Sequence, residues 1–115
     1  MNLCDIKTIR QIMAMFSLSF RKEFGQNFLI NSDVVEEIAE RCTDDPESTL
    51  LEIGPGVGTL TRELAARYKK VVALEIDRGL IPVLKYTLGD FSNVQVINED
   101  VMKADLPALL APHFA

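Results

Sequence analysis

Apolar residues recur at helical spacing in the N-terminal part of the chain. The first stripe consists of Ile6, Ile9, Ile12, Met13 and Phe16. It predicts an amphipathic helix over about residues 5–16. A second stripe consists of Val34, Val35, Ile38, Ala39 and Cys42. It predicts a helix that starts at residues 31–33, with Asp33 and Glu36 as a capping box. This helix should end near Thr43, and Cys42 should pack in the core.

The rest of the chain alternates between short apolar runs and helical patterns. Three apolar runs of strand length lie at residues 49–53, 71–76 and 94–97. Helical patterns follow them at residues 59–69, 79–88 and, more weakly, 104–110. The second run is almost unbroken, which is typical of a strand buried on both faces of a parallel sheet. The order of elements predicts an α/β fold, the first half of an open, doubly wound parallel sheet.

A glycine-rich turn follows the first predicted strand. Gly54, Gly56 and Gly58 stand at alternate positions, and a helical pattern begins at Thr59. Glycine lets the backbone approach a ligand closely, because no side chain intervenes. The dinucleotide fingerprint G-x-G-x-x-G would need a glycine in place of Thr59. The spacing G-x-G-x-G, preceded by Glu52, resembles instead the first motif of S-adenosylmethionine methyltransferases. The alternative is a tight strand-to-helix turn without a ligand.

A distinctive residue stands where each predicted strand ends. These residues are Gly54, Glu75 and Asp100. Ligands of open α/β sheets bind beyond the carboxyl ends of the strands, and neighbouring strands lie about 5 Å apart. The three ends should therefore line one crevice of adenosine size. Glu75 follows Gly54 by 75 − 54 = 21 positions, close to the roughly 20 of an acid that binds ribose hydroxyls. Taken singly, each acid could equally cap a helix or start a turn.

Composition and charge narrow the function classes. The chain has 115 residues, of which 48% are hydrophobic and 25% charged, as expected of one small globular domain. No apolar run is long enough to span a bilayer, and charged residues interrupt the N-terminal stripe, so the cytoplasm is the default location. Cys4, Cys42 and the single His113 lack metal-ligand spacing, so no metal site is expected. The net charge of −5 argues against strong RNA binding by this chain alone, although RNA can still be the substrate of a larger protein.

Four segments together resemble the opening motifs of the rRNA adenine dimethyltransferase family. They are Phe24-Gly25-Gln26-Asn27-Phe28-Leu29, Glu52-Ile53-Gly54-Pro55-Gly56-Val57-Gly58, Leu74-Glu75-Ile76-Asp77 and Asn98-Glu99-Asp100-Val101. The similarity covers about residues 20–110 and is greatest to the KsgA type. That type dimethylates two adjacent adenines near the 3′ end of 16S rRNA during ribosome biogenesis. The resemblance implies a Rossmann-like methyltransferase fold, S-adenosylmethionine as cofactor, and rRNA or the small ribosomal subunit as partner, with no membrane and no metal.

The resemblance also implies a set of cofactor-binding residues. They are Gln26, Asn27, Leu29, Gly54, Gly56, Glu75 and Asp100. The first three would flank the cofactor from an N-terminal loop, and the two glycines would let the backbone meet its amino-acid part. Glu75 would bind the ribose hydroxyls, and Asp100 the adenine amine.

One motif of the family does not occur. The catalytic Asn-x-Pro-Tyr or Asn-x-Pro-Phe, which follows the fourth strand in the family, is not in the sequence. We therefore expect residues 1–115 to be the N-terminal part of a methyltransferase domain, without catalytic residues, without the C-terminal domain and inactive alone. Residues 1–30 would form a helix and the cofactor-flanking loop, and residues 31–115 a half-sheet truncated before strand four. An open, apolar first strand would then favour self-association.

Three alternatives keep part of this pattern. The macrolide-resistance type, which methylates large-subunit rRNA, shares these motifs, although the N-terminal helix followed by residues 16–24 is more similar to the KsgA type. A non-catalytic nucleotide-binding domain would keep the glycine turn and transfer no methyl group. A small-molecule methyltransferase would share the turn and Glu75, and the motif at residues 26–29 argues against it.

Overall fold

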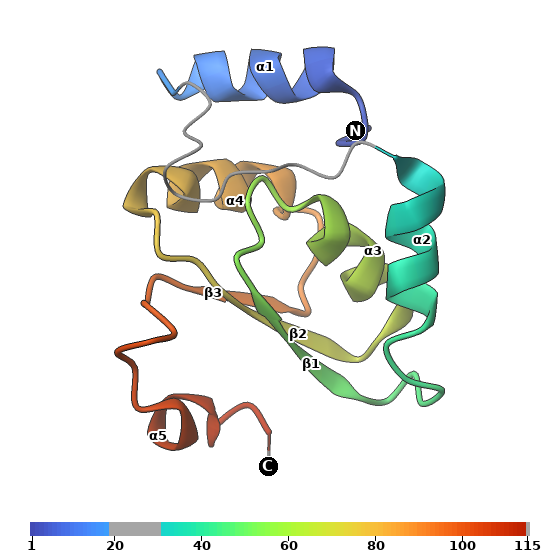
Figure 1. The fold of residues 1–115 in the computed structure, drawn as a ribbon, viewed down its shortest axis with the longest axis vertical. Coiled ribbons are helices and arrows are strands. Elements are labelled where there is room, and N and C mark those ends of the chain that lie inside the picture. Colours follow the sequence, from blue (N-terminus) through green and yellow to red (C-terminus); the bar gives the residue numbers. More distant parts are fainter. Residues whose placement is uncertain (19–30, 115) are drawn as a thin grey trace.

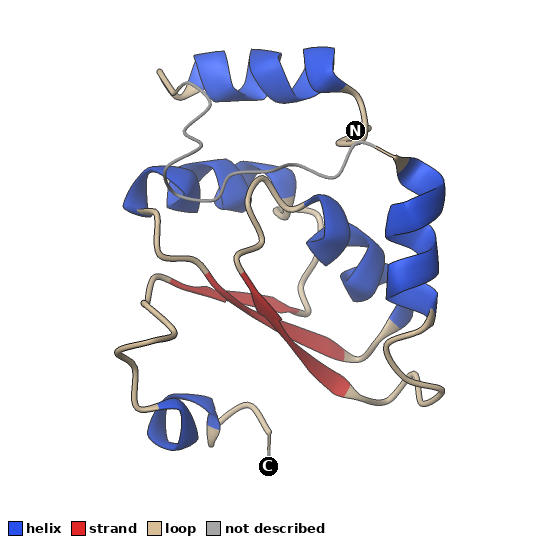
Figure 2. Ribbon diagram, in the orientation of Figure 1, coloured by secondary structure: helices blue, strands red, loops and turns tan. Residues whose placement is uncertain are grey.

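The computed structural model describes residues 1–18 and 31–114. Its elements are α1 (Ile6–Met15), α2 (Ser32–Glu40), β1 (Thr49–Ile53), α3 (Thr59–Arg67), β2 (Lys70–Leu74), the 3-10 turn η2 (Arg78–Leu80), α4 (Ile81–Thr87), β3 (Val94–Ile97) and α5 (Leu106–Leu110). Figures 1 and 2 show their arrangement.

The three strands form one parallel sheet in the order β1-β2-β3. Leu51 of β1 lies opposite Val72, and Val72 lies opposite Gln95 of β3. The central strand β2 is buried from Val71 to Leu74, as its unbroken apolar run predicts. The expected half of a doubly wound sheet is confirmed, with β1 at one edge.

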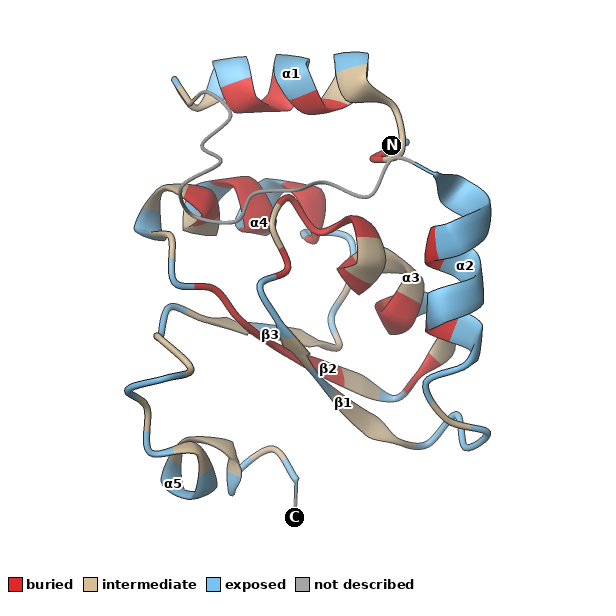
Figure 3. Cartoon of the chain, viewed as in Figure 1, coloured by how far each residue is buried: buried red, intermediate tan, exposed pale blue. Residues whose placement is uncertain are grey.

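Helices cover the two faces of this sheet unequally. α2, α3 and α4 lie on one face, α1 lies over α4, and α5 lies on the opposite side (Figure 1). One core cluster joins α1 to α4 and the glycine turn; it contains Leu3, Ile9, Ile12, Met13, Val57, Leu80 and Val83. Figure 3 shows that the buried side of α1 faces α4. The glycine turn therefore sits within the packed, helix-covered half of the molecule.

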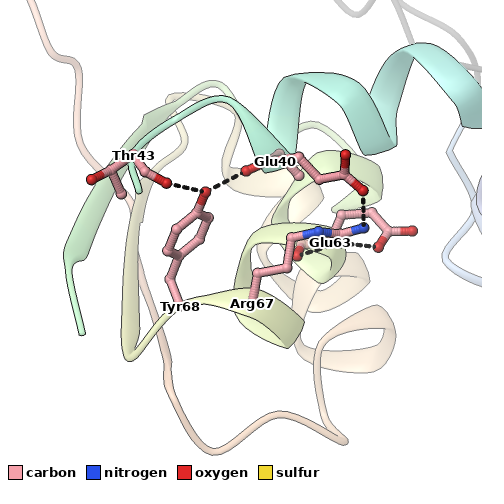
Figure 4. A network of polar contacts seen from close by, with 6 residues as sticks. Glu40, Thr43, Glu63, Arg67 and Tyr68 are labelled. Carbon is pink, nitrogen blue, oxygen red and sulfur yellow. Dashed lines mark hydrogen bonds and ion pairs between the residues drawn. The ribbon is translucent and has the colours of Figure 1, made fainter. Parts of the chain in front are cut away.

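A second cluster fixes α2 on α3 and on the sheet. It contains Ala39, Leu64, Ala65, Tyr68 and Val71. The buried Tyr68 hydroxyl donates to the carbonyl oxygens of Ala39 at 2.6 Å and Thr43 at 3.2 Å. Arg67 pairs with Glu63 at 2.7 Å and with Glu40 at 3.7 Å (Figure 4). These polar contacts join the last turn of α2 to the last turn of α3.

The structure corrects two expectations about α2. The cap is Asn31 and not Asp33, because the Asn31 side chain accepts from the backbone N–H groups of Asp33 (3.0 Å) and Val34 (3.3 Å). The helix ends at Glu40, so Cys42 lies beyond it and is exposed instead of packed in the core. The Cys42 thiol donates to the Ile38 carbonyl oxygen at 3.2 Å.

Other boundaries shift by a few residues. The helix expected at 79–88 begins as the 3-10 turn η2 and continues as α4, with Pro82 in the first turn of α4, where a missing N–H has no consequence. β2 ends at Leu74 and β3 at Ile97. Glu75 and Asp100 therefore follow their strands instead of ending them.

Candidate cofactor-binding site

The glycine turn leaves β1 in a conformation that glycine alone adopts easily. Gly54, Gly56 and Gly58 have φ angles of +70°, +61° and +98°, which residues with a Cβ adopt at a cost. The Gly54 N–H donates to the Leu74 carbonyl oxygen at 2.8 Å, so the start of the turn is held by β2. A Cβ on Gly54 would meet no atom within 4 Å. The backbone there faces open space from which a ligand can approach.

Glu75 is buried beneath this turn, with 5% of its surface exposed. One carboxylate oxygen accepts from the Gly56 N–H at 3.1 Å, and the other accepts from the Asp77 N–H at 2.9 Å. Burial raises the pKa of Glu75 above its ordinary value, although both N–H groups act in the opposite direction. Glu75 thus connects the turn after β1 to the turn after β2.

A second carboxylate, Glu52, lies on the same side of the sheet. It accepts from the Thr61 hydroxyl of α3 at 2.5 Å. Burial raises the pKa of Glu52 to about 7; the Thr61 hydrogen bond opposes this shift and the nearby Glu75 adds to it. The motif contains Glu52, but its partner Thr61 is not evident from the sequence because it depends on how α3 packs.

Asp100 follows β3 in a turn. One of its carboxylate oxygens accepts from the Met102 N–H at 2.9 Å, and its backbone carbonyl accepts from the N–H groups of Lys103 and Ala104. Asp100 therefore starts a turn, which is one of the roles that its sequence position allows. An ionised carboxylate offers about four acceptor positions, so one such bond leaves capacity for a ligand.

A cavity of about 180 Å³ joins the ends of the three strands. It is lined by Ile53, Gly54, Leu74, Ile76, Glu99, Asp100 and Val101. Its walls are mostly apolar, and the lining includes two acids, Glu99 and Asp100. Asn98 supports it by donating to the Glu75 carbonyl oxygen at 2.8 Å, which fixes the end of β3 to the end of β2. Asn98 belongs to a recognised motif, but the sequence gives it no role.

The predicted site residues come together only in part. Gly54 and Asp100 line the same cavity, and Gly56 is bonded to Glu75. Gln26, Asn27 and Leu29 lie outside the described residues. Within residues 1–18 and 31–114, no helix is long and apolar enough to cross a membrane. Over the same residues, no three potential metal-binding side chains come together.

The arrangement fits an adenosine-type cofactor. Gly54 presents backbone with free space in front of it. Ile53, Leu74 and Ile76 supply the apolar surface that a planar base requires, and Asp100 supplies an acceptor for an amine. These residues are compatible with S-adenosylmethionine.

Comparison with known proteins identifies the family. The family model for ribosomal RNA adenine dimethylase matches residues 17–114. The ribosomal RNA small subunit methyltransferase A of Alkaliphilus metalliredigens (strain QYMF) is 49% identical over 105 residues, 91% of this chain and 37% of that protein. The protein of the same name from Staphylococcus carnosus (strain TM300) is 44% identical over 118 residues, 100% of this chain and 40% of that protein.

The fold of this chain is also similar to that of an rRNA methyltransferase of known structure. The crystal structure of the 23S rRNA methyltransferase ErmE matches with a TM-score of 0.63 and 41% identity, over 68% of this chain and 32% of that chain. The present chain spans about two fifths of the length of the curated relatives. Because the family model matches nearly all of its residues, the chain belongs to the ribosomal RNA adenine dimethylase family.

Proposed function

We propose that this chain is the cofactor-binding part of a KsgA-type, S-adenosylmethionine-dependent rRNA (adenine-N6) dimethyltransferase. The observation that supports this most directly is the shared cavity of Gly54 and Asp100 at the carboxyl ends of the strands. Glu75, at the end of the strand between them, is bonded to the same glycine turn. Two of the three residues that the sequence singles out at the strand ends thus line one cavity, and the third is bonded to the glycine turn beside it.

We assign each of these residues a part in binding the cofactor. Bound S-adenosylmethionine supplies an electrophilic methyl group on a positively charged sulfur. The Asp100 carboxylate would accept from the adenine amine, and Glu75 would accept from ribose hydroxyls while it retains the Gly56 N–H. The backbone at Gly54 and Gly56 would contact the amino-acid part, and the family resemblance implies that Gln26, Asn27 and Leu29 would also bind the cofactor.

The proposed substrate is a pair of adjacent adenines near the 3′ end of small-subunit rRNA. Two relatives at 44–49% identity are named as small-subunit methyltransferases. A large-subunit target is the second candidate, because the 23S rRNA methyltransferase ErmE is 41% identical over the superposed part.

A chimaera in which this chain replaces the matching part of the Staphylococcus carnosus relative should label under-methylated small subunits. Label confined to large subunits would favour the second candidate.

Titration calorimetry with S-adenosylhomocysteine tests the cofactor site. Glu75→Ala should weaken binding by about 1–3 kcal/mol, because hydrogen bonds to the ribose and to the turn are both lost. The exposed Glu36 of α2 provides a matched control, since Glu36→Ala removes a carboxylate that does not line the cavity. Unchanged affinity in a folded Glu75→Ala protein would contradict the assignment.

The chain alone should not transfer methyl groups. The adenine-orienting Asn-x-Pro-Tyr or Asn-x-Pro-Phe motif is not in its sequence, and positioning of the weakly nucleophilic adenine amine depends on such groups. The assay is incubation with labelled S-adenosylmethionine and under-methylated small subunits. Label that appears in adenine only when this chain is added would contradict the prediction.

A further inference from the structure

The glycine turn is held from behind by a residue of α4 that no motif contains. Thr87, the last residue of α4, is fully buried. Its hydroxyl donates to the carbonyl oxygen of Val57 at 2.7 Å. Val57 lies between Gly56 and Gly58 in the turn. A threonine in a helix usually donates to a carbonyl of its own preceding turn, so this bond across 30 residues is directed specifically to the glycine turn.

The packing at this contact is close. A Cβ built on Gly58 would lie 2.9 Å from the Thr87 hydroxyl oxygen and 3.2 Å from a methyl carbon of Leu88. Thr87 therefore fills the space behind Gly58 as well as bonding to Val57. The position of Thr87 is itself fixed, because its carbonyl accepts from the Arg62 guanidinium at 2.5 Å. Arg62 also forms a two-bond pair with Asp90, at 2.7 and 3.0 Å.

Two side chains from different elements thus hold the glycine turn. Glu75 accepts from the Gly56 N–H, and Thr87 donates to the Val57 carbonyl. The Pro55–Gly56 and Val57–Gly58 peptide groups are therefore both held by side chains. This matters in a turn with three glycines, since glycine has the widest range of backbone conformations to lose. A turn that is already ordered binds a ligand more tightly, because less ordering remains to be done.

We propose that Thr87 is a positioning residue for the cofactor: its buried hydroxyl holds the glycine turn in the shape that contacts the amino-acid part of S-adenosylmethionine. The inference rests on the proposed function for the identity of the ligand. The ordering of the turn itself does not depend on that identity.

The test compares Thr87→Val, which keeps the shape and removes the donor, with Thr87→Ser, which keeps the donor. Thr87→Val should bind S-adenosylhomocysteine roughly three- to tenfold more weakly, the range that one hydrogen bond gives. Thr87→Ser should stay within about twofold of the wild type. Tyr68→Phe is the control, because it removes a buried hydroxyl bond of 2.6 Å at the α2–α3 contact. It should lower stability and leave the affinity unchanged.

Amide hydrogen exchange without ligand gives an independent measurement. Thr87→Val should speed exchange of the Gly58 N–H, which is bonded to the Pro55 carbonyl at 2.9 Å, relative to amides in the middle of α3. Thr87→Ser should not. If the wild-type chain binds no S-adenosylhomocysteine, the proposed function fails, and these exchange rates still decide the role of Thr87.

Wild-type affinity in Thr87→Val, or equal exchange at Gly58, would overturn the proposal and leave Thr87 a packing residue. Should Thr87→Val not fold, Thr87→Cys serves in its place, because a thiol of similar size is only a weak donor. Wild-type affinity in Thr87→Cys would overturn the proposal in the same way.

Discussion

Glu52 is an acid whose protonation should affect stability near neutral pH. Its pKa in the folded chain is raised from 4.5 to about 7, chiefly by burial. The folded state therefore holds more protons than the unfolded state between these values, and stability falls as pH rises through this window. The size of this pKa shift sets an upper limit of about 3 kcal/mol on the loss of unfolding free energy. We expect the free energy of unfolding to decrease from pH 5 to pH 7.5 and then to level off.

Glu52→Gln should flatten this pH dependence, because the amide keeps an acceptor for Thr61 and does not ionise. A slope from Glu75 should remain, since burial raises its pKa too. Urea unfolding at several pH values is the measurement, with exposed Glu36→Gln as the matched control. A Glu52→Gln protein with the same slope as the wild type would show that Glu52 is ionised throughout.

Substitution by alanine should destabilise the chain by different amounts at Gly58 and Gly54. Gly58→Ala combines a φ of +98° with a contact of 2.9 Å to Thr87, so we expect a loss of more than about 2 kcal/mol in unfolding free energy. Gly54→Ala has a φ of +70° and no neighbour within 4 Å, so only the backbone cost of about 1–2 kcal/mol applies. Chemical denaturation of both variants checks the order. Equal losses would mean that the turn moves away from α4 without cost.

At the scale of elements, the order of helices and strands could be predicted, because the strands are short apolar runs and most helices have apolar residues at helical spacing. The residues that begin and end the helices were harder to predict. Asn31, Ser32 and Asp33 are all good capping residues, and only the backbone path selects Asn31. Cys42 matched the apolar stripe of α2, but the helix ends before it. A periodic pattern does not show where a helix stops when no glycine or proline marks the end.

The contact of α2 with α3 depends strongly on one side chain. The Tyr68 hydroxyl donates to the carbonyl oxygen of Ala39, in the last turn of α2, and to that of Thr43, just beyond this helix. Tyr68→Phe should cost about 1–2 kcal/mol, because the ring still packs while a buried acceptor is left unpaired. Hydrogen exchange should speed up in α2 more than in β2. Uniform acceleration over both would show that α2 does not open separately.

At the scale of the whole molecule, the site depends on contacts between residues far apart in sequence. The parallel sheet predicts that Gly54, Glu75 and Asp100 lie at the same edge. Gly54 and Asp100 do line one cavity, and Glu75 is bonded to the glycine turn. Thr61, Thr87 and Asn98 could not be found in this way, because their bonds join different elements. A threonine at the end of a helix has no distinctive pattern until the helix is placed against the turn.

The open edge of β1 leads to a prediction about association. Within the described sheet, β1 pairs on one side only, with β2. Leu51 and Ile53 are 38% and 49% exposed, and Leu51 borders an apolar cavity of about 390 Å³ between the sheet and α5. Unpaired backbone groups beside exposed apolar side chains favour strand addition by another chain. We therefore expect the chain to self-associate as its concentration rises.

Leu51→Lys should reduce this association, because a charged side chain beside the edge would have to be desolvated when a second strand docks. Met102→Lys is the control, since Met102 is 87% exposed but lies outside the sheet. Sedimentation velocity and thermal unfolding at several concentrations measure the effect. A wild-type chain that sediments as a monomer throughout, with one sharp transition independent of concentration, would show that three strands and their helices suffice. Association that persists unchanged in Leu51→Lys would place the contact elsewhere than the β1 edge.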